Sequence, residues 1–120
     1  MLFGGIQRTM FMPSYSKGSV VLVRFPFSDL TGAKVRPAIV ASIFHASQDI
    51  FIVPLTSKID RLQAGEFIMA DWQGAGLNVS SAVKRGIFTI HQSHIIKSVG
   101  SVSIADTQQL ERSLRSWLGL

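Results

Sequence analysis

Residues 33–42 read AKVRPAIVAS, and this stretch decides how the chain is interpreted. Pro37 precedes a run of alanine and β-branched residues that is typical of a buried strand. Because a proline is tolerated at the first residue of a strand and not in its middle, we expect the strand to open at Pro37. Pro37 also holds Arg36 in an extended conformation at the mouth of that strand. Arg36 is there either a clamp for an anion or a solubilising charge at a loop end.

Apolar runs on both sides of this stretch predict further short strands. Each run is followed by turn-forming residues, as in the SDLTGAK stretch at 28–34 and the HASQD stretch at 45–49. Periodicity leaves the boundaries within 80–100 open, because strand-like and helical pieces alternate there. The predicted strands cover residues 19–27, 36–44, 50–56 and 66–72.

The end of the chain has a different pattern. Leu110, Leu114 and Trp117 recur at helical spacing, which predicts one C-terminal helix. Asp106 is a candidate N-cap for it. Several short strands closed by one helix predict a mainly β fold, a small barrel or curled sheet with a capping helix.

Composition limits the classes of protein. The chain has 120 residues, enough for one domain, which we place at 17–120 after an N-terminal arm at 1–16. It has no cysteine, which excludes disulfides and thiolate sites. The formal charge of +5 suits a polyanionic partner such as nucleic acid. No apolar run approaches the roughly 20 residues that cross a bilayer, so we expect no membrane association and a cytoplasmic location.

Two groups of polar residues are candidates for a site. Thr56, Ser57 and Lys58 directly follow a predicted buried strand, where they either form a site or satisfy turn backbone groups. Phe25 and Phe27 could stack on bases, although alternating phenylalanines are more often packed in a core. The basic residues that could line one face with them are Arg24, Lys34, Arg36, Lys58, Lys84 and Arg85.

No metal or cofactor site is predicted. His91 and His94 are three residues apart, but two histidines without a third ligand make a weak zinc site. His94 is also a candidate general base. The chain has no Gly-rich phosphate loop and no nucleophile elbow.

The stretch KGSVVLVRFPFSDLTGAKVRPAIVAS at 17–42, with VPLTSKI at 53–59, resembles the PemK/MazF family of type II toxin–antitoxin ribonucleases. The resemblance extends over residues 17–118. Family members have an acidic residue after the first glycine, where this chain has Ser19. The resemblance implies an SH3-like barrel of antiparallel strands with a terminal helix. It also implies a homodimer that cuts single-stranded RNA without a metal and is neutralised by an antitoxin protein.

Carried over residue by residue, the resemblance makes Arg36 the catalytic arginine and Thr56 the catalytic hydroxyl. The 2′-OH of RNA would attack the adjacent phosphorus and leave a 2′,3′-cyclic phosphate and a 5′-OH, while these residues stabilise the phosphoryl oxygens. Neither is a natural general base near neutral pH, so the base stays open, with His91 and His94 as candidates. We expect the RNA to be bound by Phe27, Lys34, Ser57, Lys58, Lys84 and Arg85.

Two alternatives accompany this reading. A barrel of this fold could bind nucleic acid or protein without cutting it, because fold alone does not fix function. The homodimer is expected because the chain is richer in late apolar residues than one small core needs; the alternative is that the C-terminal helix covers them all. These residues are Ile87, Phe88, Ile90, Ile95 and Ile96.

Overall fold

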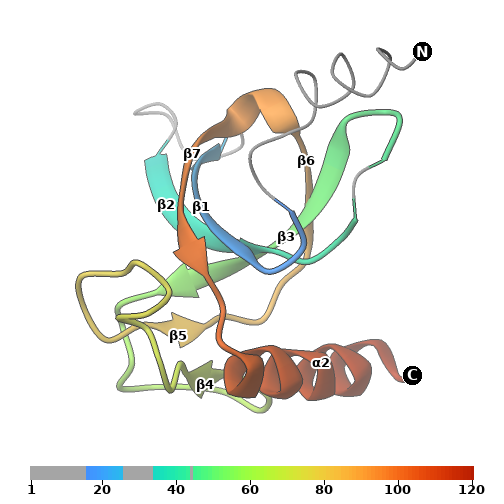
Figure 1. Cartoon of the computed structure of the whole chain (residues 1–120). Helices are drawn as coiled ribbons and strands as arrows, with labels where there is room; N and C mark the ends of the chain where they lie inside the picture. Colours follow the sequence, from blue (N-terminus) through green and yellow to red (C-terminus); the bar gives the residue numbers. More distant parts are fainter. Residues whose placement is uncertain (1–15, 26–33, 44) are drawn as a thin grey trace.

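The computed structural model describes residues 16–25, 34–43 and 45–120 (Figure 1). The predicted arm at 1–16, Ser16 excepted, and Phe27 therefore lie outside the described residues. The chain forms short strands followed by one long helix. In chain order the elements are β1 (Ser19–Phe25), β2 (Lys34–Val40), β3 (Asp49–Thr56), β4 (Phe67–Ile68), β5 (Ala82–Val83), β6 (Phe88–His91), the 3-10 helix η1 (Gln92–His94), β7 (Ile95–Ser101) and α2 (Ile104–Leu118).

The strands pair antiparallel throughout the described residues. Their order is β4-β5-β3-β2-β1-β7, with β6 paired to β3 outside this path. Figure 1 shows β1, β2, β3, β6 and β7 curling around a common interior, with α2 below them. The mainly β fold with a C-terminal helix is confirmed, but the sheet is not closed, because no pairing among the described strands joins β7 to β6 or to β4.

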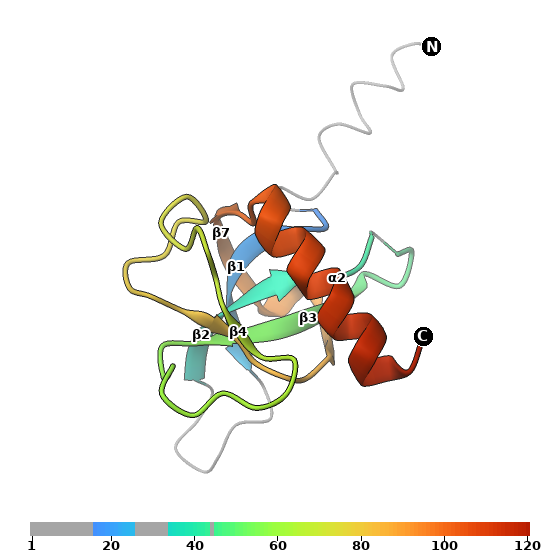
Figure 2. The same ribbon diagram turned by 90° about the horizontal axis from the view of Figure 1, so that it is seen from below.

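The curled sheet separates two apolar clusters, because successive side chains of a strand point to opposite faces. The inner cluster fills the curl, and α2 does not reach it. The outer cluster is covered by α2 through Leu110, Leu114 and Trp117, and Figure 2 shows the helix lying across the sheet. The buried residues of the inner cluster are Val21, Val23, Phe25, Ala38, Val40, Ile50, Ile52 and Ile90. Those of the outer cluster are Val20, Ile39, Val53, Leu55, Met69, Ala75, Val83 and Leu110.

The predicted N-cap of the helix was wrong. Ser103 is the N-cap, and its hydroxyl oxygen accepts a hydrogen bond from Asp106 N at 3.1 Å. Asp106 lies in the first turn and is buried. Its carboxylate accepts hydrogen bonds from Ala70 N at 2.8 Å and Asp71 N at 3.0 Å, which joins the helix to the loop after β4. Asp106 does not cap the helix because its carboxylate is bound to backbone N–H groups about 35 positions earlier in the chain.

Pro37 is not the first residue of its strand. β2 begins at Lys34, so Pro37 is its fourth residue and pairs with Leu22. The proline is tolerated because β2 pairs with β3 only from Ala38 onward, which leaves the first half of the strand with β1 as its one partner among the described residues. Of the predicted strand at 66–72, only Phe67–Ile68 is extended, because Ala70 N and Asp71 N bond the Asp106 side chain.

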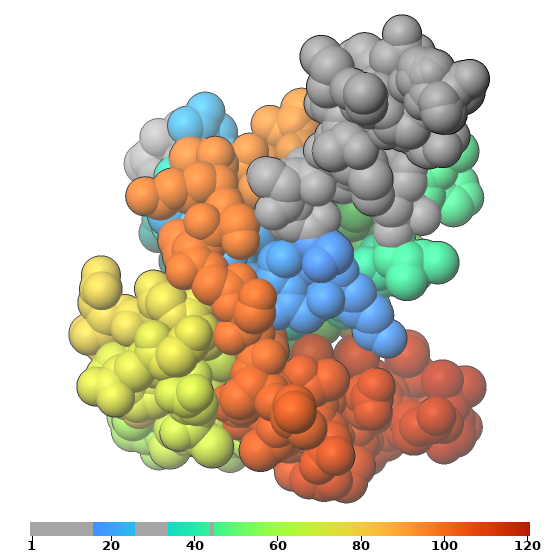
Figure 3. Space-filling view, viewed as in Figure 1, coloured from blue at the N-terminus to red at the C-terminus, as the bar shows by residue number. Residues whose placement is uncertain are grey.

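A groove of about 380 Å³ lies between α2 and the adjoining ends of β1, β2 and β7. In Figure 3 the start of β1, in blue, sits directly above α2, in red. The groove is lined by Lys17, Ile39, Val102, Leu110, Glu111 and Leu114, among others. Ile39 belongs to the outer cluster, so this groove lies on the helix side of the sheet.

Candidate functional site

Arg36 and Thr56 lie on the same face of the sheet. Ala38 pairs with Pro54, and Arg36 and Thr56 are each two residues beyond that pair on their own strands. Since the side-chain period of a strand is two, both share the face of Ala38, which is the face of the inner cluster. β3 has by then turned to β5, where Thr56 pairs with Ala82. The two strand ends therefore bring a guanidinium and a hydroxyl to one rim of the curl.

Arg36 is exposed and uncommitted in the described part of the chain. It pairs with the fully buried Val23, so its stem begins at the edge of the inner cluster. Its guanidinium has no ion pair or hydrogen bond to any described residue. Lys34 pairs with Phe25 on the same face. An exposed guanidinium whose donors meet no acceptor among the described residues, with a second cation two positions before it, suits a phosphate group.

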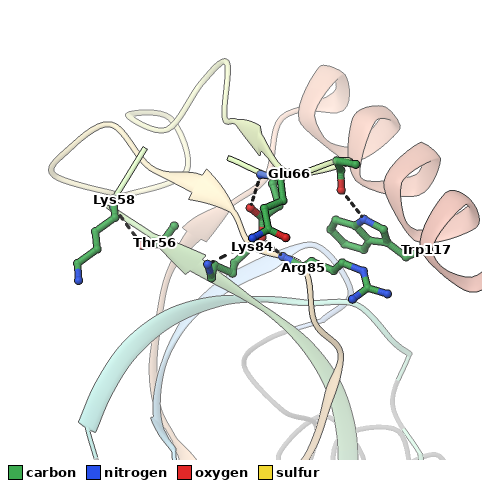
Figure 4. Close-up of polar contacts among 8 residues, drawn as sticks. Thr56, Lys58, Glu66, Lys84, Arg85 and Trp117 are labelled. Carbon is green, nitrogen blue, oxygen red and sulfur yellow. Dashed lines mark hydrogen bonds and ion pairs between the residues drawn. The ribbon is translucent and has the colours of Figure 1, made fainter. Parts of the chain in front are cut away.

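The Thr56 hydroxyl has a defined orientation. Its Oγ1 accepts a hydrogen bond from Lys58 N at 3.1 Å (Figure 4). Because a backbone N–H can only donate, the hydroxyl proton of Thr56 stays available for an outside acceptor. Ser57 and Lys58 are exposed, and the Lys58 side chain extends away from the other labelled residues. The turn interaction expected of this triplet is therefore present, and it leaves the hydroxyl proton of Thr56 free for the expected site chemistry.

Lys84 and Arg85 join this rim through β5. Lys84 N donates to Pro54 O at 2.9 Å, which continues the β3–β5 ladder. Lys84 is 4.0 Å from the carboxylate of Glu66. In Figure 4 the Arg85 guanidinium reaches below the Trp117 indole, on the side away from Thr56. Of the two predicted cations, Lys84 is therefore the one grouped with Thr56.

Glu66 is a charged residue of this region that the sequence patterns did not single out. Its Oε2 accepts from Arg85 N at 2.8 Å and its Oε1 accepts from Gln63 N at 2.8 Å. The hydrogen bond from Arg85 N is the largest cause of a lowered pKa of Glu66, ahead of the opposing effect of burial and the attraction of Lys84. Because Arg85 is 19 positions from Glu66 in the sequence, no local sequence pattern indicates this contact.

Arg24 does not line this face, and Phe25 takes the core position that was the alternative to base stacking. Arg24 pairs with Val35, so it lies on the opposite face from Arg36. Phe25 is only 6 % exposed and cannot offer its ring to a base. It packs edge-on against Phe88 with the ring centroids 5.9 Å apart. Phe88, one of the late apolar residues named above, is half-buried and packs against the inner cluster.

The two candidate base histidines have different environments. His91 Nδ1 accepts from Ser93 N at 3.1 Å, so the lone pair with which this nitrogen could act as a base is already engaged by the backbone. His91 also pairs with Asp49, at the opposite end of β3 from Thr56. The His94 side chain makes no hydrogen bond to a described residue, and the next residue, Ile95, pairs with Val23, whose other partner is Arg36. The geometry therefore favours His94 over His91.

The described residues contain no group of three or more His, Asp or Glu side chains placed to hold a metal ion. Around Thr56 this rim carries the cations Lys58 and Lys84 and the hydroxyl of Ser57. The carboxylate of Glu66 lies beside Lys84, between the loop after β3 and the segment after β5. Such a surface attracts an anionic chain and can stabilise charge that develops on a phosphoryl oxygen.

The sequence matches the family model of the PemK-like, MazF-like toxin of type II toxin-antitoxin system over residues 16–118. The chain belongs to this family. The match covers both candidate strands and the helix, so the PemK/MazF-like domain includes all the elements described above. A search of curated proteins found no match.

Solved structures share the PemK/MazF-like fold. An endoribonuclease from a mycobacterial species is 22 % identical, with a TM-score of 0.68 over 92 % of this chain and 96 % of that chain. MazF from Deinococcus radiodurans is 20 % identical, with a TM-score of 0.72 over 91 % of this chain and 100 % of that one. A mycobacterial endoribonuclease in complex with its cognate antitoxin is 19 % identical, with a TM-score of 0.69 over 89 % of this chain and 97 % of that chain.

The similarity to these structures establishes the fold of this PemK/MazF-like toxin. Its described part contains no helix that is long and apolar enough to span a membrane.

Proposed function

We propose that this toxin is an endoribonuclease that cuts single-stranded RNA without a metal ion. The observation that carries the proposal is the placement of Arg36 and Thr56 on one face, at matching positions of neighbouring strands. The family and the endoribonucleases of the same fold support it. We further propose a cytoplasmic location.

The reaction needs no group beyond the RNA and the chain. The 2′-oxygen attacks the adjacent phosphorus, the bond from phosphorus to the 5′-oxygen breaks, and the products are a 2′,3′-cyclic phosphate and a 5′-OH. Arg36 neutralises the charge that develops on the phosphoryl oxygens, and the Thr56 hydroxyl donates a hydrogen bond to the same oxygens. His94 is the candidate that takes the proton of the 2′-OH, and a proton is returned to the leaving 5′-oxygen, so that the reaction gains and loses no net proton.

The cations of the rim hold the rest of the RNA backbone. Lys34 and Lys58 each lie two residues further along the same two chain segments, beyond Arg36 and Thr56, with Ser57 beside Lys58. Lys84 and Arg85 continue this basic surface toward Trp117. We retain Phe27 as the residue that stacks on a base, although it lies outside the described residues.

We propose that two copies associate and join their basic surfaces into one groove. Of the late apolar residues, Ile90 is buried in the inner cluster, and Phe88 and Ile95 pack against it. Ile87 and Ile96 remain 38 % and 46 % exposed, and α2 packs against the other cluster and does not cover them. The antitoxin is then expected to carry an acidic segment that competes with RNA for the groove.

The test is incubation of the purified toxin with a long RNA, followed by mapping of the new 5′ ends. We expect 5′-OH ends in excess EDTA, and an uncut strand when the nucleotide at the cleavage site is 2′-deoxy. Activity that EDTA abolishes and magnesium restores would overturn the mechanism. Binding of RNA without any cleavage would show instead that the barrel is a non-catalytic binding module.

A further inference from the structure

Glu66 is a buried charge at the junction of two loops. Its side chain is 3 % exposed, whereas that of Lys84, its ion-pair partner, is 55 % exposed. The carboxylate accepts from Gln63 N and Arg85 N, both at 2.8 Å (Figure 4). Charge-assisted hydrogen bonds of this length are among the stronger ones in proteins. Glu66 thus joins the loop after β3 to the segment after β5.

The first of these loops is fixed from the helix side as well. Ser113 Oγ donates to Gly65 O at 2.7 Å, and Trp117 Nε1 donates to Ala64 O at 3.0 Å. Gly65 has a positive φ of 84°, and a Cβ there would lie 2.3 Å from Trp117 Nε1. Glu66 therefore extends from a segment that α2 already holds in place.

The second segment leads directly to the proposed RNA surface. Lys84 N is bonded to Pro54 O, and Ala82 pairs with Thr56. Arg85 N has the Glu66 carboxylate as its acceptor. Without this carboxylate, the backbone at Arg85 would lose the hydrogen bond that joins it to the rest of the fold just before Gly86.

We infer that Glu66 is a positioning residue, which fixes the backbone at Lys84 and Arg85 so that their side chains meet the RNA backbone at set positions. The consequence for RNA rests on the proposed function, whereas the backbone contacts do not. Glu66 itself touches no RNA, because its carboxylate is enclosed by its own partners.

The direction in which RNA affinity changes in a Glu66 variant distinguishes a positioning role from a purely electrostatic effect of the charge. Removing a negative charge beside a basic surface should strengthen RNA binding by electrostatics alone. If Glu66 positions the cations, Glu66→Gln and Glu66→Ala should instead weaken it. We expect the Kd for an RNA that is 2′-deoxy at the cleavage site to rise about fivefold to tenfold, which corresponds to about 1 kcal/mol. Glu111→Gln, an exposed charge change on α2, is the matched control and should not weaken binding.

Amide hydrogen exchange gives a readout that needs no RNA. Exchange at Gln63 and Arg85 should become at least about tenfold faster in Glu66→Ala. Exchange at Gly74, whose N–H donates to Asp71 Oδ1 at 2.9 Å, is the internal reference and should not change. If Glu66→Ala does not fold, Glu66→Gln carries the same comparison, because it keeps the side-chain volume.

Steady-state kinetics gives a third test, because a positioning residue should affect KM and kcat differently. Since Arg36 and Thr56 keep their strand positions, Glu66→Ala should raise KM severalfold and change kcat less than about twofold. Unchanged or tighter RNA binding by a folded Glu66 variant would overturn the inference. A wild-type protein that binds RNA and never cuts it would overturn the proposed function, while the binding comparison would still decide the role of Glu66.

Discussion

Arg36 and Thr56 stand at matching positions on neighbouring strands, each two residues beyond the Ala38–Pro54 pair and on the same face of the sheet. The pairing of the two strands stops before it reaches them, because β3 turns to β5. The sheet therefore fixes where these two side chains begin, but neither side chain is buried in the core. This relationship makes the catalytic proposal testable by single substitutions.

Arg36→Ala should abolish most of the RNA cleavage and keep the fold. The residue is exposed and holds no other described group, so its removal costs little stability. Loss of a group that stabilises transition-state charge lowers kcat by roughly 100-fold or more. Initial rates on a short RNA, with circular dichroism as the check of folding, measure this. Arg24→Ala, an arginine one strand over on the opposite face, should cut within about threefold of wild type.

Thr56→Ser should retain cleavage, and Thr56→Val should lose it by roughly tenfold to 100-fold. Serine keeps the hydroxyl that accepts from Lys58 N and that, on the proposed mechanism, donates to the phosphate, whereas valine keeps only the shape of threonine. The same kinetic assay decides the matter. Equal activity of the serine and valine variants would mean that Thr56 serves the turn and not the chemistry.

Acid should remove the contribution of Glu66 to stability. The pKa of Glu66 is lowered from its ordinary value of 4.5, chiefly by the hydrogen bond from Arg85 N. The stabilisation is therefore complete above the unfolded-state pKa and is lost as the pH falls through the lower folded-state pKa. The difference in Tm between wild type and Glu66→Gln should be largest near pH 6–7 and shrink below about pH 4.5. A difference that is constant between pH 7 and pH 3 would contradict this.

Asp106→Asn should destabilise the fold by about 2–3 kcal/mol. The residue is 3 % exposed, and its two carboxylate oxygens accept from Ala70 N and Asp71 N. In asparagine one of these oxygens becomes an NH2 group, which is itself a donor and cannot accept from the backbone N–H that it faces. Urea denaturation measures the change. Asp60→Asn, at an exposed residue with no hydrogen bond to a described residue, is the control and should stay within about 0.5 kcal/mol.

Salt dependence should report whether one or two chains line the RNA groove. For single strands, log K falls with log salt with a slope of about −0.7 per phosphate neutralised. The five cations proposed to meet RNA on one chain would give a slope of about −3.5, and a groove shared by two chains about −7. Titration of a non-cleavable RNA at several salt concentrations measures the slope, and light scattering gives the mass. A monomer with the shallow slope that still cuts RNA would rule out the shared groove.

The sequence by itself determined the local elements of this protein. Runs of valine, isoleucine and phenylalanine predicted the strand at 19–27, observed as Ser19–Phe25, and that at 50–56, observed as Asp49–Thr56. The helical spacing of Leu110, Leu114 and Trp117 predicted the helix and its buried side. These features depend on side-chain periods within one segment, which the sequence states directly. The match with a toxin family, carried by the Arg36–Pro37 and Thr56–Ser57 stretches, was available at the same level.

Only the tertiary structure decided which residues share a face. Arg36 and Arg24 are arginines of two neighbouring strands, yet the pairing register places them on opposite sides of the sheet. The sequence makes Asp106 an N-cap candidate, but in the fold its carboxylate accepts from Ala70 N and Asp71 N. The carboxylate of Glu66 likewise accepts from Arg85 N, 19 positions away. The physical reason is that backbone N–H groups must find acceptors wherever the folded chain places them. Those partners are fixed by strand register and loop packing, which a local pattern does not contain.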